Sequence, residues 1–222
     1  MLSDAHYEIT HDKEPIRLFR SDFLEFFTHI HPVVVLIIWL PVIGICLYLA
    51  LRQVPAASGT PGVTILLGFV AGLFLWTLTE YTLHRFVFHF RPRTPIQERV
   101  IYLFHGIHHH QPRCKTRLVM PPAVSIPLAV LFYAAFYLVL GLILGNPHWV
   151  APTFAGFLTG YLAYDMLHYA THHIRLRWRI LKYLKRYHLQ HHYRTPDRRF
   201  GVSSPLWDLA FGTRPADKPR QD

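Results

Sequence analysis

Ten of the seventeen histidines in this 222-residue chain form one spacing pattern that occurs twice. The pattern reads H-x4-H-x15-H-x2-HH in the first copy and H-x3-H-x15-H-x2-HH in the second. The first copy consists of His84, His89, His105, His108 and His109, and the second of His168, His172, His188, His191 and His192. One metal ion rarely binds more than about six ligands, so ten imidazoles predict two ions. The repeat therefore indicates a metalloenzyme with a two-metal site.

The spacing within each copy fits helices that turn their histidines toward one side. Both H-x2-HH triplets have the spacing i, i+3, i+4, and the second copy begins with an i, i+4 pair, so the members of each group share a helix face. His84 and His89 are five residues apart, which predicts a helix end or a bulge. Glu80 precedes His84 by four residues, and Asp165 precedes His168 by three. We expect each carboxylate to accept the second ring N–H of a metal-binding imidazole.

The ligand types favour redox chemistry. Imidazole suits zinc, copper, iron and nickel, and it withstands oxidants that would destroy thiolates. The chain has only two cysteines, Cys46 and Cys114, and no C-x-x-C. Neither copy of the repeat contains the Glu-x-x-His pair of soluble di-iron bundles. The pattern predicts a histidine-only metal pair outside that class.

Four uncharged stretches predict membrane spans, since about 20 apolar residues cross a bilayer as a helix. They are Val33–Leu51, Gly62–Thr79, Val119–Gly145 and Trp149–Tyr164. We expect an all-α integral membrane protein with about four transmembrane helices and a cytoplasmic helical cap that holds the di-metal site. Pro121, Pro122 and Pro127 predict a kink or a short lead-in at the third span. The alternative is a soluble bundle, but buried helices of soluble proteins are shorter than these stretches.

Basic residues place both histidine segments on one face of the membrane. Most cations lie between the second and third stretches or after Ile174, whereas the loops on the opposite side hold only Arg52. The positive-inside rule then predicts a multi-pass protein with both termini in the cytoplasm. The membrane is the plasma membrane in a bacterium or the endoplasmic reticulum in a eukaryote. The net charge of +10 suits anionic headgroups, and we expect no nucleic acid partner.

We divide the chain into a cytoplasmic N-terminal segment at residues 1–32, a membrane-embedded domain at 33–213 and a polar tail at 214–222. Residues 1–31 lack the pattern of a signal peptide, so the first span is expected to remain as an anchor. The seven histidines outside the repeat are expected to bind no metal.

Five longer motifs accompany the histidines. They are HGIHHHQP (105–112), RLVMPP (117–122), GYLAYDMLHYATHH (160–173), YHLQHH (187–192) and FGVSSPLWDLAFGT (200–213). Over about residues 73–213, the chain resembles the fatty acid hydroxylase/sterol desaturase superfamily of membrane di-iron oxygenases. The motifs around RLVMPP and LWD resemble its fatty acid 2-hydroxylase branch.

The resemblance implies that the ten histidines bind two iron ions, with zinc as a possible substitute in preparations and O2 as co-substrate. It also implies that the substrate is a fatty acid or fatty acyl lipid, hydroxylated at the carbon next to the carbonyl. Asp208, in the last motif, joins Glu80 and Asp165 as an acid expected to support the ligands.

The sequence departs from the family in two places. Eukaryotic members often carry an N-terminal cytochrome b5 domain, and residues 1–31 are too short for one. We therefore expect an external electron donor, which is a cytochrome b5-like protein, a ferredoxin or a reductase. Relatives also tend to have an acid where this chain reads Arg113-Cys114-Lys115, which bears on the substrate headgroup.

Other functions remain open at this point. A sterol or carotenoid oxygenase of the same superfamily would share the histidines. A metal-ion transporter would also combine spans with histidines, but its ligands belong near the membrane midplane rather than at span ends and in loops. A structural zinc scaffold is a further alternative.

Overall fold

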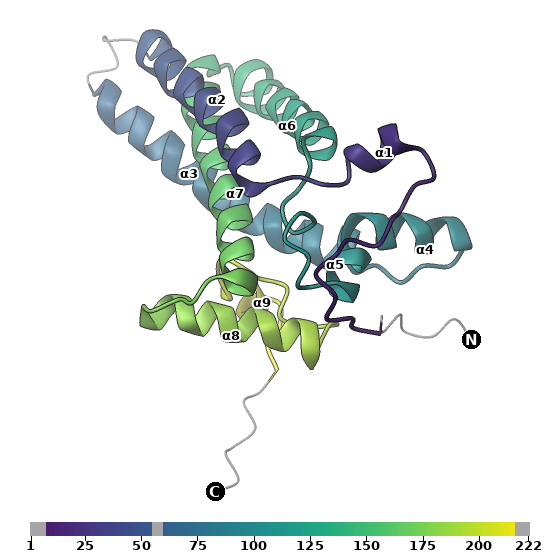
Figure 1. The fold of residues 1–222 in the computed structure, drawn as a ribbon. Coiled ribbons are helices and arrows are strands. Elements are labelled where there is room, and N and C mark those ends of the chain that lie inside the picture. Colours follow the sequence, from purple (N-terminus) through teal and green to yellow (C-terminus); the bar gives the residue numbers. More distant parts are fainter. Residues whose placement is uncertain (1–7, 55–59, 216–222) are drawn as a thin grey trace, which may run out of the picture. The chain divides into compact units, whose positions relative to one another are not determined.

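The computed structural model describes residues 8–54 and 60–215, and within these ranges all regular elements are helices (Figure 1). The α-helices are α1 (Asp22–Phe26), α2 (Pro32–Gln53), α3 (Pro61–Leu83), α4 (Pro95–Ile101), α5 (Ile107–His110), α6 (Pro122–Phe136), α7 (Val150–His173), α8 (Arg179–Tyr193) and α9 (Leu206–Ala210). Short π-helical turns are η2 (His84–Phe88), η3 (Tyr102–Gly106) and η4 (Tyr137–Ile143), and η5 (Pro147–Trp149) is a 3-10 turn. The all-helical fold class is confirmed.

The helices form two compact units. The histidine unit comprises residues 8–13, 77–114 and 167–215, and the span unit comprises 14–54, 60–76 and 115–166. Helices α3 and α7 each contribute one end to each unit. All ten histidines of the repeat belong to the histidine unit. The three segments predicted from the sequence, with boundaries after residues 32 and 213, stay a prediction.

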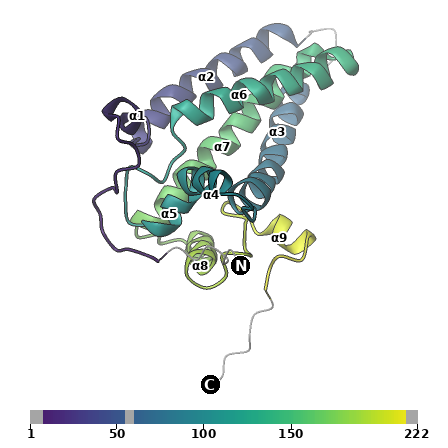
Figure 2. The same cartoon turned by 90° about the vertical axis from the view of Figure 1, so that its right-hand side faces the viewer.

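Helix α7 lies at the centre of the span unit, beside α2, α3 and α6 (Figures 1 and 2). The Tyr161 ring of α7 packs edge-on against Trp39 of α2, with ring centroids 5.6 Å apart. Phe157 of α7 contacts Phe132 of α6, with centroids 4.8 Å apart. Large aromatic side chains thus fill the space between α7 and two of its neighbours.

Two glycines bring α3 and α7 into direct backbone contact. A Cβ atom added to Gly72 of α3 would lie 1.9 Å from the carbonyl oxygen of Thr153. A Cβ atom added to Gly156 of α7 would lie 1.9 Å from the carbonyl oxygen of Phe69. Only glycine permits this approach, which is the usual way in which membrane helices pack closely.

Within the described residues, three helices are long and apolar enough to cross a membrane, namely Pro32–Gln53, Pro61–Phe88 and Pro122–Ile143. They correspond to the first three predicted stretches. Leucine, isoleucine and valine side chains on their surfaces are largely exposed, as expected for a lipid environment; Ile37 and Val130 are 65% and 64% exposed. Pro122 begins α6, and Pro127 lies inside it.

The fourth predicted stretch differs from the other three. It forms α7, a helix of 24 residues, but its composition does not place it among the helices apolar enough to cross. The reason is its central position, since α7 uses glycine, threonine and tyrosine to pack against other helices rather than large apolar side chains toward lipid. A fourth span at α7 stays a prediction.

Candidate metal centre

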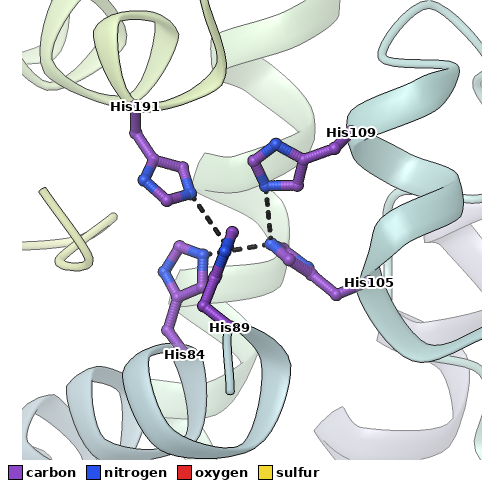
Figure 3. Close-up of side chains that lie close together, drawn as sticks. All are labelled: His84, His89, His105, His109 and His191. Carbon is purple, nitrogen blue, oxygen red and sulfur yellow. Dashed lines mark hydrogen bonds between the residues drawn. The ribbon is translucent and has the colours of Figure 1, made fainter. Parts of the chain in front are cut away.

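The repeat histidines lie in two groups of five, each able to hold a metal ion. Group A consists of His84, His89, His105, His109 and His191 (Figure 3), and group B of His108, His168, His172, His188 and His192. In each group, the ring nitrogens that would bind metal all lie within 4.8 Å of one another. The rings of His109 and His192, one from each group, stack with centroids 4.0 Å apart, so the two groups are neighbours.

Each group takes four histidines from one copy of the repeat and one from the other copy. The histidine that changes group is the middle member of each H-x2-HH triplet. His108 of the first copy lies with the second, and His191 of the second copy lies with the first. The structure thus places each histidine of the repeat in one of two groups, which the spacing alone did not do.

A π-helical turn brings His84 and His89 to the same group. The turn η2 begins at His84, and the His89 N–H donates to the His84 carbonyl oxygen over 3.1 Å. This i, i+5 bond widens the helix by one residue, so side chains five apart lie on the same face. The bulge predicted from the H-x4-H spacing is confirmed.

The spacing of the imidazole nitrogens fits a bound cation. In group A, the Nε2 atoms of His84 and His109 lie 3.1 and 2.9 Å from Nε2 of His105. In group B, the Nε2 atoms of His172 and His192 lie 2.9 and 3.0 Å from Nε2 of His188. Two nitrogens that bind one ion at about 2.1 Å and at right angles are about 3.0 Å apart. The donor set therefore fits one metal ion in each group.

Burial keeps the imidazoles in the neutral form that binds metal. Burial and then the neighbouring imidazoles lower the pKa of His105 and of His109 well below the usual value of 6.5. The same causes, in the same order, lower the pKa of His188 and of His192. Metal binding at neutral pH therefore needs no proton to be displaced from these rings.

A loop from Arg198 to Ser203, which we call the carbonyl loop, orients two histidines of group A. Nδ1 of His84 donates to the carbonyl oxygen of Phe200, and Nδ1 of His191 donates to that of Arg198 over 2.7 Å. These bonds turn the Nε2 atoms of both rings toward the group. Sequence reasoning missed both acceptors, because a backbone carbonyl has no residue-type signature.

Asp208 holds the carbonyl loop in place through hydrogen bonds from the loop's backbone. Its carboxylate is completely buried and accepts the N–H groups of Phe200 and Gly201 over 2.9 and 2.8 Å. It also accepts the Thr213 hydroxyl over 2.7 Å. A Cβ atom on Gly201 would lie 2.0 Å from the Ser204 carbonyl oxygen, so the loop needs glycine there. Asp208 is thus linked to the His84 ring through the backbone of Phe200.

Glu80 also contacts the carbonyl loop rather than a ligand. Its Oε1 accepts the N–H groups of Val202 and Ser203 over 2.6 and 2.8 Å, and its Oε2 accepts the Ser203 hydroxyl. The sequence predicted a direct bond from His84 to Glu80, but the two ring nitrogens of His84 face Phe200 and His105. The predicted direct bond is therefore wrong: Glu80 binds the carbonyl loop, and that loop carries the Phe200 carbonyl oxygen that accepts from His84.

Asp165 belongs to the span unit and is fully buried there. Its two oxygens lie 3.4 and 3.3 Å from the Met120 backbone nitrogen, and the Tyr161 hydroxyl interacts with the same carboxyl. Met120 is part of the RLVMPP motif, so Asp165 fixes the start of the segment that leads into α6. The expected bond from His168 to Asp165 stays a prediction.

The remaining histidines of the described ranges lie outside both groups. His29 contacts Glu25 and Thr116, and His31 caps the N-terminus of α2. His110 contacts the Tyr102 hydroxyl over 2.8 Å. His173 packs against Tyr169. His11 and His148 also belong to neither group, and His6 lies outside the described residues.

Comparison with known proteins gives one consistent family. The sequence profile named "Fatty acid hydroxylase" matches residues 69–213. The chain is 39% identical over 211 residues to the dihydroceramide fatty acyl 2-hydroxylase FAH1 of Arabidopsis thaliana, which covers 95% of this chain and 85% of that protein. It is 37% identical over 235 residues to the fatty acid 2-hydroxylase of Homo sapiens, covering 97% of this chain and 60% of that protein. A solved structure of full-length scs7p, in which only the hydroxylase domain is visible, is similar with a TM-score of 0.79 and 39% identity, covering 89% of this chain and 72% of that chain.

Proposed function

We propose a specific activity from the premise that the chain belongs to the fatty acid hydroxylase family, as a membrane oxidoreductase that hydroxylates lipid. In this proposal it is an O2-dependent 2-hydroxylase of a fatty acid or fatty acyl lipid, and it uses two iron ions. The observation that carries the proposal is the pair of five-histidine groups. When bound, two iron ions supply the activation of O2 and the removal of hydrogen from unactivated carbon.

The chain's own residues prepare the site for this chemistry. Groups A and B present neutral imidazoles at spacings that fit one ion each. His188 and His191 are completely buried, so water reaches the ligands poorly and side reactions of an oxidised site are suppressed. The carbonyl loop fixes the ring orientations of His84 and His191, so that less reorganisation is needed when metal binds.

The proposed orientation follows from the charge distribution and the helices. We place both termini and the two histidine groups on the cytoplasmic side, with α7 as the fourth span. The acyl chain then lies in the bilayer, and its carboxyl end, the only polar part, rests at the membrane surface near the histidines. This arrangement favours oxidation close to the carbonyl rather than far along the chain.

The reaction also needs two electrons from a redox donor. Hydroxylation incorporates one oxygen atom of O2 into the substrate and reduces the other to water, which consumes two electrons and two protons. We propose a cytochrome b5-like protein, a ferredoxin or a reductase as the source.

Labelled O2 tests the proposal. Protein in nanodiscs receives a reduced donor, a long-chain fatty acyl lipid and ¹⁸O2, and the products are analysed by mass spectrometry. We expect one ¹⁸O atom at carbon 2. His192→Ala should abolish product, whereas His148→Ala, outside both groups, should retain it. Unlabelled product contradicts O2 as the source, and a hydroxyl on a sterol or carotenoid contradicts the substrate while leaving the metal site intact.

A further inference from the structure

Helix α1 and its C-cap residue Phe27 expose four large apolar side chains. Phe23, Leu24, Phe26 and Phe27 are 71%, 48%, 75% and 43% exposed. The ring centroid of Phe27 lies 5.1 Å from that of Phe23 and 5.5 Å from that of Phe26, so the rings form one cluster. We call these four side chains the phenylalanine patch. A patch of this kind on a protein surface marks a contact with a partner or a membrane.

The opposite face of α1 is polar and held in place by buried contacts. Glu25 accepts the backbone N–H groups of Leu18 and Phe19 over 2.9 and 2.8 Å. It also pairs with Arg117, whose side chain is only 2% exposed, over 2.6 Å. His29 lies 3.0 Å from both Glu25 and the Arg117 guanidinium. We call Glu25, His29 and Arg117 the polar cluster. Their contacts fix the orientation of α1, with the phenylalanine patch facing away from the polar cluster.

The polar cluster also fixes α1 close to the ends of two candidate spans. Helix α2 begins at Pro32, a few residues after Phe27, and α6 begins at Pro122, a few residues after Arg117. The Ile30 N–H donates to the Thr116 carbonyl oxygen over 2.8 Å, which joins the two lead-in segments. Where these two helices enter the bilayer, the phenylalanine patch must therefore lie near the membrane surface.

We propose that α1 is an interfacial anchor, whose phenylalanine patch inserts into the boundary between lipid headgroups and acyl chains. The patch continues into exposed apolar residues at the start of α2, where Val33 is 49% and Ile37 is 65% exposed, so the apolar surface runs on into the side of a span. Arg20, exposed just before α1, is suitably placed for anionic headgroups.

A second protein is a less suitable occupant than lipid. A stable protein interface buries about 800 Å² on each partner, which requires some 20 residues a side. The phenylalanine patch has four side chains, and its extension along α2 is a surface that the membrane itself covers. A lipid bilayer would cover both the phenylalanine patch and the exposed apolar residues of α2.

Spin labels on the full chain in nanodiscs of phosphatidylcholine and phosphatidylglycerol test the anchor. Phe26→Cys and Phe23→Cys are labelled in a background in which the buried Cys46 and Cys114 are replaced by alanine. Power saturation compares collisions with O2, which enters the bilayer, and with a nickel chelate, which stays in water. Arg20→Cys, exposed on the same segment, is the matched control.

We expect the label at Phe26 to lie about 5–10 Å into the headgroup and acyl boundary, with O2 collisions favoured. The label at Phe23 should behave alike, and the label at Arg20 should favour the nickel chelate. Nickel-favoured collisions at both phenylalanine positions would place the patch in water and overturn the proposal. Protection from both reagents would overturn it too, because protein would then cover the patch.

Discussion

Replacement of Asp208 by asparagine tests whether the carbonyl loop determines metal binding in group A. The wild-type carboxylate accepts the N–H groups of Phe200 and Gly201 and the Thr213 hydroxyl, without any exposure to solvent. Asparagine has the same shape, but it offers one acceptor oxygen and one NH2 donor. At least one of the N–H groups of Phe200 and Gly201 then faces a donor. An unsatisfied buried group of this kind costs about 1–3 kcal/mol.

That cost falls on the position of the Phe200 carbonyl and hence on His84. Loss of an outer hydrogen-bond partner of a metal ligand typically weakens metal affinity about 10–100-fold. Since a tenfold change corresponds to about 1.4 kcal/mol, this range matches the cost of the lost hydrogen bond. The carbonyl loop holds the rings of His84 and His191, which both belong to group A, so group B should be spared.

Metal quantification during chelator titration measures the effect. We expect wild-type protein to lose its two ions over one concentration range, and Asp208→Asn to lose about one ion at a 10–100-fold lower chelator concentration. Asp197→Asn is the control, because its side chain is 75% exposed and makes only a 3.9 Å contact with Arg198. Equal retention of both ions by Asp208→Asn and wild type would refute the argument that the loop orients the ligands of group A.

Three further predictions concern other parts of the chain. Gly156→Ala should lower the thermal midpoint through a cost of about 1–3 kcal/mol, because its Cβ meets the Phe69 carbonyl oxygen, whereas Gly44→Ala, with nothing within 4 Å, should leave it unchanged. Asp165→Asn should slow hydroxylation with partial retention of metal; unchanged turnover and metal content would make it an ordinary structural acid. Burial raises the pKa of Glu25, but hydrogen bonds from Phe19, His29 and Leu18 and the charge of Arg117 outweigh it and lower the pKa below its usual 4.5. Because this carboxyl pKa is lowered, the stability that ionised Glu25 gives to the position of α1 is complete at neutral pH and is lost only as the pH falls below about 4.5. A spin label at Phe26 should therefore stay immobile from pH 8 to 5 and become mobile below that range. Mobility that already rises at pH 6 would contradict the role of Glu25.

The sequence predicts most of what depends on local spacing. The H-x4-H spacing indicated the bulge that the structure contains as η2, and the uncharged stretches indicated three of the apolar helices. It predicts less where one segment depends on a distant one. The acceptor of the His84 ring is a carbonyl 116 positions away, and nothing in the type of residue 200 indicates that role. The contacts of α7 likewise depend on tertiary packing. Its glycine and tyrosine residues pack against neighbouring helices, and a hydropathy scale does not indicate this role.

The exchange of His108 and His191 between the groups has a simple origin in helix geometry. Successive residues of an α-helix are about 100° apart, whereas residues i and i+4 are about 40° apart. His105 and His109 can therefore reach one ion together, while His108, next to His109, points well away toward a second ion. The same reasoning separates His191 from His188 and His192. An H-x2-HH triplet on one helix thus suits two neighbouring ions better than one, and two such triplets facing each other complete both sites. Each site then depends on both copies of the repeat, so the two metal ions should bind only when the two segments have folded together.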